Sequence, residues 1–197
     1  MINQPTKRIF AWFDEGGIYV YQAFKPSIVQ FAATNGTFGA GFTLDRMTWI
    51  KPSFGWVLHR SGYATKPRQE AIARVHLNHA GFLEILEQAV PTLYDERLFD
   101  SERNWSLALK NSDVRYQWDP DRDLHDRKLG RRAIQLGIRG EAVRRYVQEW
   151  IQGVEDVTTL AHVIGTAVKT GSGVLPEVPQ EMEYLIPPHL QRIMGYD

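Results

Sequence analysis

The stretch Ala73-Arg74-Val75-His76-Leu77-Asn78-His79-Ala80-Gly81-Phe82 has the pattern of a β-strand that turns into an α-helix. After the turn, apolar residues recur at helical spacing until Pro91. Residues 134–143 repeat the pattern later in the chain, and there we expect the helix to continue to Gly153. Strands and helices that alternate in this way predict a mixed α+β domain.

Further strands are expected on both sides of these units. Two β-type runs, 8–13 and 18–24, flank Asp14-Glu15-Gly16-Gly17, which is a strong hairpin signal, so we expect them to pair antiparallel. Another strand is predicted at 114–118. The expected fold is a single domain with a mixed, largely antiparallel sheet of about five strands and four or five packed helices.

Proline and glycine mark where helices begin and end. Pro26 begins a predicted helix that stops before the glycine-rich loop 36–41, and a later helix runs from Asp156 as N-cap to Gly171. We therefore expect a compact domain over residues 1–171. Residues 172–197 are expected to form a proline-rich tail packed on that domain, with prolines at 176, 179, 187 and 188.

Composition limits the functions that the chain can have. Its 197 residues carry 23 basic and 23 acidic side chains, so any contact with nucleic acid must come from a local patch. The chain contains no cysteine, which excludes disulfides, thiolate nucleophiles and sulfur-ligated metal sites. We expect a cytoplasmic protein without a signal peptide or membrane insertion, and we assign no cofactor.

The most informative segment for chemistry is 45–63. Pro52 and Gly62 suit the two ends of a helix over 52–61, and Lys51 immediately precedes it. Lys51, the Ser53 hydroxyl and the first-turn amides are predicted to hold a phosphate. Side chains that add charge or a stacking surface to this substrate site are Arg46, Trp49, Trp56, Arg60 and Tyr63. The alternative is that Trp49 and Trp56 are core residues with Arg60 laid across one of them.

Candidate catalytic groups lie close to this segment. His59 is a candidate base, Glu70 a candidate carboxylate at the start of a strand, and Lys51 the candidate charge-binding or nucleophilic amine. The alternative for Glu70 is an exposed glutamate without a role. Common phosphate-loop, dinucleotide, serine-hydrolase and zinc-protease motifs are missing from the sequence.

A second basic concentration runs from Arg127 to Arg145. Such a run could follow a nucleic-acid backbone, for which the candidate residues are Arg131, Arg132 and Arg139. We favour the alternative of a solvated face, in which Glu141 pairs with Arg145.

Metal sites are not predicted. The carboxylates at 119–123 resemble the start of a calcium loop, but Leu124 stands where glycine is required. A turn with an aspartate cap is the expected structure there. His76 and His79 straddle the end of a strand and are expected to be satisfied polar residues.

Five strings identify a resemblance that spans nearly the whole chain. They are Val20-Tyr21-Gln22-Ala23-Phe24, Arg46-Met47-Thr48-Trp49-Ile50-Lys51-Pro52-Ser53-Phe54, His59-Arg60-Ser61-Gly62-Tyr63, Gln117-Trp118-Asp119-Pro120 and Ile134-Gln135-Leu136-Gly137. Together they resemble the domain of unknown function 4291 family. That resemblance implies no activity.

Two functional hypotheses follow from the residues. The leading one is a transferase that acts on a nucleotide or nucleic acid at phosphate or ribose, and one version is an ADP-ribosyltransferase-like enzyme in which Glu70 steadies an oxocarbenium ion. The other is a non-catalytic RNA-binding or protein-interaction module. The expected partner is therefore a nucleotide or RNA.

Overall fold

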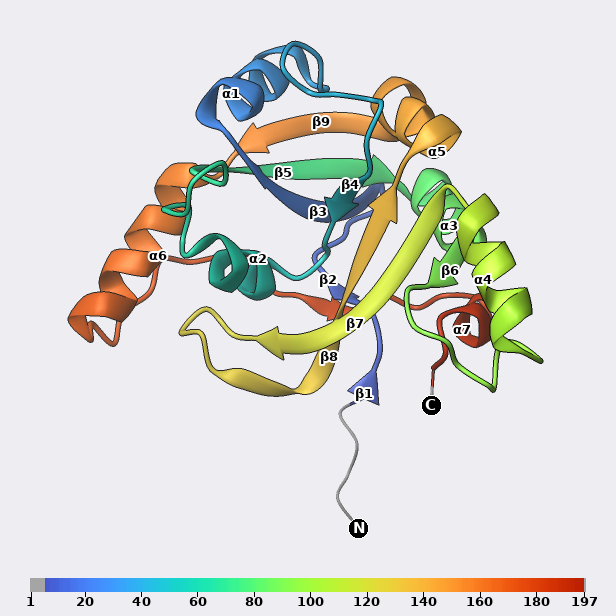
Figure 1. The fold of residues 1–197 in the computed structure, drawn as a ribbon. Helices are drawn as coiled ribbons and strands as arrows, with labels where there is room; N and C mark the ends of the chain where they lie inside the picture. Colours follow the sequence, from blue (N-terminus) through green and yellow to red (C-terminus); the bar gives the residue numbers. More distant parts are fainter. Residues whose placement is uncertain (1–5, 197) are drawn as a thin grey trace.

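The computed structural model describes residues 6–196, and its framework is two β-sheets (Figure 1). The three-stranded sheet is antiparallel, with β5 (Ala71–Asn78) between β3 (Gly17–Phe24) and β9 (Ile151–Asp156). β5 carries small or apolar residues at nearly every inward position, as a central strand should. The strand predicted from the opening stretch is confirmed at the centre of this sheet.

The five-stranded sheet is built around one long hairpin. β7 (Val114–Arg122) and β8 (Lys128–Ile138) pair antiparallel along most of their length. The remaining strands of this sheet are β1 (Thr6–Lys7), β4 (Thr48–Ile50) and β6 (Ala89–Pro91). β1 on β8 and β6 on β7 are parallel, and β4 on β8 is antiparallel. The predicted α+β class is confirmed, although the strands divide between sheets.

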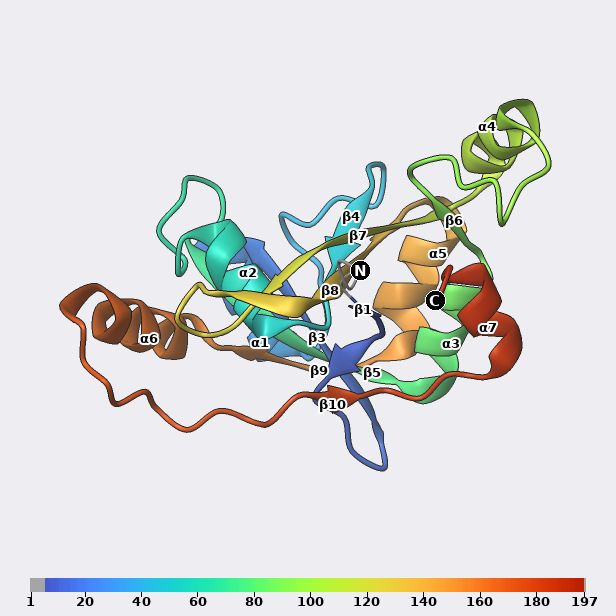
Figure 2. The same cartoon turned by 90° about the horizontal axis from the view of Figure 1, so that it is seen from below.

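Helices cover the sheets on several sides (Figures 1 and 2). α1 (Pro26–Asn35) packs on β5 and β9, and α2 (Phe54–Ser61) packs on β3 and β7. α3 (His79–Glu87) follows β5 directly, and α4 (Glu102–Asn111) projects from the body in Figure 2. The remaining helices are α5 (Gly140–Arg145), α6 (Thr158–Thr170) and α7 (Pro188–Ile193).

The main hydrophobic core lies between the two sheets and the helices α1 and α3. Val75 and Leu77 of β5 and Leu136 and Ile138 of β8 are fully buried in it, together with Phe82 of α3. A smaller cluster joins α2 to α6 on the other side of the three-stranded sheet. Burial of these side chains supplies most of the driving force for the fold.

The predicted N-terminal hairpin is only partly right. The turn is present, because the Asp14 carboxylate accepts hydrogen bonds from the backbone N–H groups of Gly16 and Gly17, and Phe13 bridges Ile18. However, β2 (Phe10–Ala11) pairs with β10 (Met182–Glu183), not with β3. A late segment of the chain therefore supplies the partner that the local pattern assigned to the hairpin.

The helix predicted to reach Gly153 is confirmed only as far as Trp150. A π-helical turn, Tyr146–Trp150, ends the helix, and β9 begins at Ile151. Trp150 is buried against Gly81, where an added Cβ would lie 2.3 Å from the indole. This contact fixes the end of the helix. The residues that follow it form β9, which pairs antiparallel with β5 at the edge of the three-stranded sheet.

Residues after 171 pack on the rest of the structure. Tyr184, Ile186, Leu190 and Met194 are buried in the main core, and the segment forms β10 and α7. In Figure 2 the segment runs along the lower side of the molecule from α6 to α7. Within residues 6–196, every helix is too short or too polar to cross a bilayer.

Candidate functional site

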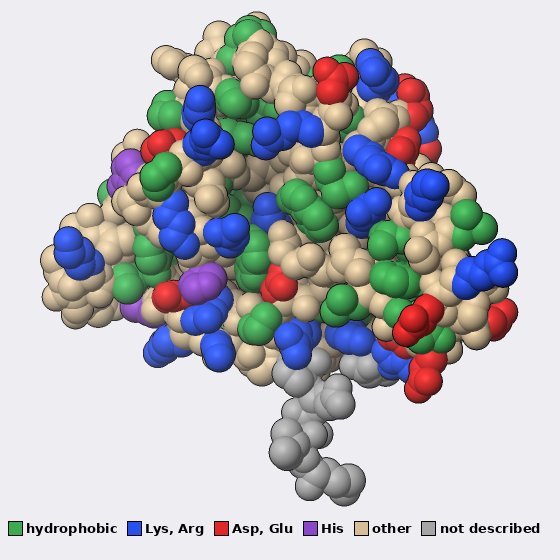
Figure 3. Space-filling model, in the orientation of Figure 1, with side chains coloured by type: hydrophobic (Ala, Val, Ile, Leu, Met, Phe, Trp, Pro, Cys, Tyr) green, Lys and Arg blue, Asp and Glu red, His purple; other side chains and the backbone are tan. Residues whose placement is uncertain are grey.

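Lys51 lies at the junction of the two sheets. It follows β4, which pairs with β8 in the five-stranded sheet, and its own backbone pairs with Tyr21 of β3. Tyr21 N donates to the Lys51 carbonyl at 2.7 Å, and Lys51 N donates to the Tyr21 carbonyl at 3.3 Å. The junction therefore fixes the Lys51 backbone from both sides. The face seen in Figure 3 is hollowed near its centre, and Lys and Arg side chains gather around the hollow.

The Lys51 ammonium has an unusual environment. Its Nζ donates to the Trp49 carbonyl at 3.1 Å and lies 5.5 Å from the centroid of the Trp56 ring. Burial and then the positive charge of Arg60 lower the pKa of Lys51 to about 7, while the negative charge of Asp119 opposes this. The neutral form of Lys51 is therefore accessible near pH 7, so the amine can accept a proton there.

Asp119 is the acid whose negative charge acts on the Lys51 amine, and two glutamines hold its carboxylate. Gln117 Nε2 donates to both carboxylate oxygens at 3.2 Å, and Gln135 Nε2 also donates to the carboxylate. Gln117 and Gln135 are register partners on β7 and β8. No ion pair to Asp119 is formed within the described residues 6–196. Asp119 thus presents a fixed carboxylate on the sheet that carries β4.

Sequence reasoning missed Asp119 because residues 119–123 were interpreted as a turn. β7 instead continues through Pro120 to Arg122, and the turn comes afterwards. There the Asp123 carboxylate accepts hydrogen bonds from the N–H groups of His125 and Arg127, so an aspartate cap exists four residues later. The alternation of polar residues along 115–119 was the available signal for Asp119.

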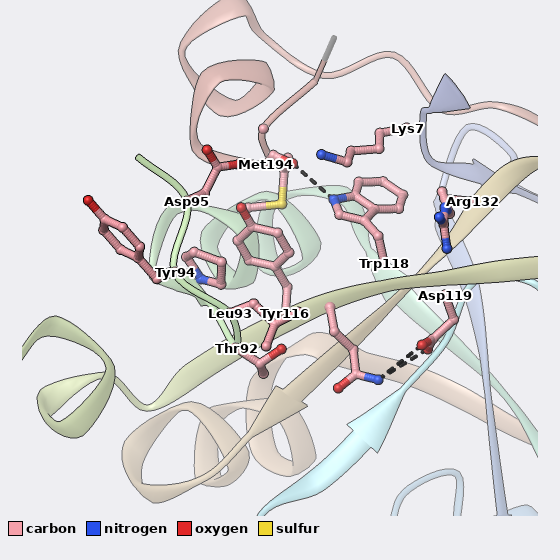
Figure 4. Close-up of a pocket in the computed structure, with 13 residues that line it drawn as sticks. Lys7, Thr92, Leu93, Tyr94, Asp95, Tyr116, Trp118, Asp119, Arg132 and Met194 are labelled. Atoms are coloured by element: carbon pink, nitrogen blue, oxygen red, sulfur yellow. Dashed lines mark hydrogen bonds between the residues drawn. The ribbon is translucent and has the colours of Figure 1, made fainter. Parts of the chain in front are cut away.

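A pocket of about 520 Å³ lies on the edge of β7 next to Asp119 (Figure 4). Trp118 and Tyr116 lie on one side of the strand and Asp119 on the other. The Tyr116 hydroxyl donates to the Ile193 carbonyl at 2.8 Å, and Trp118 Nε1 donates to the Met194 carbonyl at 3.0 Å. Both rings are therefore fixed by the C-terminal segment. Lys7 and Arg132 add positive charge to the wall.

The N-terminus of α2 is filled by groups of the protein itself. Ser53 is the N-cap, because its Oγ accepts from the Trp56 N–H at 3.2 Å, and its hydroxyl donates to Asp121 Oδ1 at 2.7 Å. The Glu181 carboxylate accepts from the Phe54 N–H at 2.6 Å. The predicted phosphate position at this helix start is thus occupied by Asp121 and Glu181. The helix begins at Phe54 because Ser53 is extended.

Arg131 joins these two carboxylates. Its Nε lies 2.7 Å from Asp121 Oδ2, and its Nη2 lies 3.2 Å from Glu181 Oε2. The guanidinium also stands 3.8 Å from the Phe10 ring centroid. Burial raises the pKa of Glu181 to about 7, although the Phe54 N–H and the Arg131 charge act against this. Arg131, a candidate for nucleic-acid contact, is therefore engaged in an internal network.

The predicted catalytic residues are held in different places. His59 Nδ1 lies 2.6 Å from Asp126 Oδ1 in the β7–β8 turn. The Glu70 carboxylate accepts hydrogen bonds from the backbone N–H groups of Arg68 and Glu70, which keep its pKa below the usual range. The charges that act on Lys51 are those of Arg60 and Asp119. The structure brings Arg60 to Lys51 and engages His59 and Glu70 elsewhere.

The aromatic residues of the predicted site differ in exposure. Trp56 is 7 % exposed and belongs to the smaller core cluster, as the alternative interpretation expected. Trp49 is only partly buried, and its ring covers Gly137 of β8. Tyr63 packs on Gly165 of α6, and its hydroxyl donates to the Leu124 carbonyl at 3.2 Å. Trp49 is thus the ring best placed to contact a ligand above β8.

Arg46 lies in a separate cleft. It lines a space of about 400 Å³ together with Lys25 and Arg68. The sequence placed Arg46 in one site with Lys51, but the two residues stand at opposite ends of the β4 segment.

The remaining candidates from the second basic run are dispersed. Arg132 lines the pocket beside Asp119. Arg139 donates to the carbonyls of Lys110 and Ser112 and lies 3.7 Å from Asp113. Arg145 pairs with Glu84 and Glu149, not with Glu141 as expected. Internal ion pairs therefore use much of the charge in this run.

Residues 8–184 match the family model of a domain of unknown function, DUF4291. The chain belongs to the DUF4291 family. The match extends from β2 to the segment after β10, so both sheets and the junction at Lys51 lie within the DUF4291 region. A comparison with curated proteins finds no match.

Proposed function

We propose that this protein is an enzyme that transfers a group at the phosphate or the ribose of a nucleotide, with Lys51 as the proton acceptor. The observation that supports it most is the Lys51 amine at the junction of the sheets, with its pKa lowered to about 7. A lysine that is neutral at physiological pH is costly to maintain and is common at reactive sites.

The surroundings of Lys51 suit a nucleotide. Arg60 is exposed, forms no ion pair within the described residues and acts electrostatically on Lys51, so it can receive a phosphate. Trp49 offers a partly exposed ring for a base. The pocket beside Asp119 adds the rings of Tyr116 and Trp118, which lie on the opposite face of β7 from the Asp119 carboxylate.

Lys51 can accept the proton whether the group is transferred at phosphorus or at the ribose C1′. An acceptor hydroxyl attacks phosphorus, its proton passes to the neutral Lys51 amine, and the leaving oxygen departs with the electron pair of the broken P–O bond. In the ribose version, the C1′ bond to the leaving group breaks and the leaving group takes the electron pair, while the acceptor hydroxyl bonds to C1′ and passes its proton to the neutral Lys51 amine. Asp119 then stabilises the oxocarbenium ion, a role that the sequence had assigned to Glu70.

The test begins with a thermal-shift screen of nucleotides, dinucleotides and short RNAs on the full chain, followed by assay of the ligands that bind. We expect Lys51→Arg to keep ligand binding but to lower turnover by roughly 10²–10⁴, because arginine keeps the charge and cannot accept the proton. His59→Gln is the control and should retain activity. Full activity of Lys51→Arg, or the lack of any nucleotide ligand, would refute the proposal.

The RNA-binding alternative has a different signature. Binding of RNA that weakens steeply with salt, without product formation and without sensitivity to Lys51→Arg, would favour it. Arg131, Arg139 and Arg145 form internal ion pairs, so they support RNA binding less than the basic run in the sequence suggests. A cytoplasmic location, expected from the lack of cysteine, stays a prediction that cell fractionation would test.

A further inference from the structure

A cleft of about 400 Å³ lies between the start of α1 and the segment that leads into β4. Its basic residues are Lys25, Arg46 and Arg68, which come from three separate parts of the chain. Hydroxyl groups also line it, from Ser27, Thr43 and Thr48. No acidic residue lines this cleft. The fold thus gathers three positive charges around one concave surface.

The three charges have no ion-pair partners within residues 6–196. Glu70 is an acid outside the cleft lining whose negative charge interacts with that of Lys25. Its carboxylate, however, accepts hydrogen bonds from the backbone N–H groups of Arg68 and of Glu70 itself. Like charges placed together repel one another, and an anion in the cleft would relieve this repulsion.

The backbone around the cleft is held in conformations that favour its present shape. Arg68 has φ +65°, a left-handed conformation that is unfavourable for a side chain such as arginine. Gly41 has φ +82°, and an added Cβ there would lie 3.2 Å from Ile28 on α1. The loop at Gly41 therefore approaches α1 closely, and Arg68 stands at a position where the backbone is strained.

We propose that this cleft binds a phosphate group of a small phosphorylated ligand, with the guanidinium groups of Arg46 and Arg68 as planar donors and Lys25 as a third positive charge. Arginine forks match the geometry of phosphate oxygens, and a cleft of about 400 Å³ has room for a small molecule. β4 leads from Arg46 towards Lys51. That this phosphate belongs to the molecule on which Lys51 acts rests on the proposed function, whereas the binding itself does not.

Isothermal titration of the full chain with inorganic phosphate and with pyrophosphate, at constant ionic strength, tests the site. We expect the wild-type protein to bind pyrophosphate more tightly than phosphate, because three cations can engage two phosphoryl groups. The double variant Arg46→Ala/Arg68→Ala should lose about tenfold or more in affinity. Arg103→Ala/Lys110→Ala removes the same charge from exposed positions of α4 and should bind like the wild type.

The outcomes separate this inference from the proposed function. Wild-type protein that binds neither anion, a double variant that binds like the wild type, or an α4 control that loses affinity equally would overturn it. Binding of RNA that strengthens with length and is not displaced by pyrophosphate would also overturn it, because the charges would then serve a nucleic-acid surface. Lys51→Arg should keep pyrophosphate affinity, and a fully active Lys51→Arg that still binds pyrophosphate would refute only the catalytic role. Thermal unfolding without ligand shows whether each variant is folded.

Discussion

The tripeptide Lys-Pro-Ser occurs at the start of both α1 and α2, with opposite electrostatic results. At α2, Ser53 caps the helix, and the carboxylates of Asp121 and Glu181 meet the first turn. At α1, Lys25 is the N-cap, no side chain caps the helix, and the first turn contains no acid. The same local sequence thus gives two different helix starts. Carboxylates of the protein itself occupy the start of α2, whereas the start of α1 lies beside a cleft lined by three cations.

The difference arises from distant parts of the chain. Asp121 comes from β7 and Glu181 from the segment before β10, which lies 127 residues after Phe54. Near α1, the loops contribute Arg46 and Arg68 instead. A lysine before a helix therefore predicts an anion site only when the surrounding tertiary structure leaves that position free.

Removing Asp121 should have the largest effect on stability. Its carboxylate is 1 % exposed and accepts hydrogen bonds from Ser53, Arg122 and Arg131. Asp121→Ala leaves the Arg131 charge without this partner, so we expect a loss of about 3 kcal/mol in the free energy of unfolding by urea denaturation. Asp95→Ala, which breaks the more exposed Arg97 pair, should cost less than about 1 kcal/mol. Equal losses of unfolding free energy in the two variants would show that the buried Asp121 network stabilises the fold no more than an exposed ion pair does.

The two serines of the tripeptides give a matched comparison. Ser53→Ala removes a buried cap and should cost about 1–2 kcal/mol of unfolding free energy. Ser27→Ala removes an exposed hydroxyl without a capping bond and should change it by less than about 0.5 kcal/mol. The same denaturation series measures both. A cost at Ser27 equal to that at Ser53 would mean that the helix starts are equivalent.

Glu181 should make stability depend on pH. Burial raises its pKa from the usual 4.5 to about 7, so the folded chain binds more protons than the unfolded chain between these values. This contribution to stability is therefore present below about pH 4.5 and is lost as the pH rises to about 7. Glu181→Gln should flatten that part of the stability profile. An unchanged slope would show that Glu181 titrates normally.

The cations of the α1 cleft should matter least for stability. Because they form no ion pairs in the described structure, Arg46→Ala and Arg68→Ala should each change the unfolding free energy by less than about 0.5 kcal/mol, and a small gain is consistent with relief of repulsion. Thermal unfolding without phosphate measures this. A loss above 1.5 kcal/mol for either variant would indicate a structural role for the cation.

The sequence predicted the elements whose signals are local. Pro26, Gly62 and Gly171 mark helix boundaries that the structure confirms, and the β5–α3 unit has the expected form. β9 was missed because Val147, Trp150 and Ile151 also fit helical spacing, and only pairing with β5 decides between the two. Asp119 depended on the β7–β8 register, which local patterns do not contain.

Lys51 is where the proposed chemistry is tested most directly. Its amine is predicted to titrate near pH 7 because burial and Arg60 disfavour the charged form. Nuclear magnetic resonance of ¹³C-labelled lysine side chains can follow the Lys51 Cε signal against pH, with Lys51→Arg used to assign it. A midpoint near 7 is the expected result, and a midpoint near 10.5, as for an ordinary lysine, would contradict the proposed role of this amine as a base.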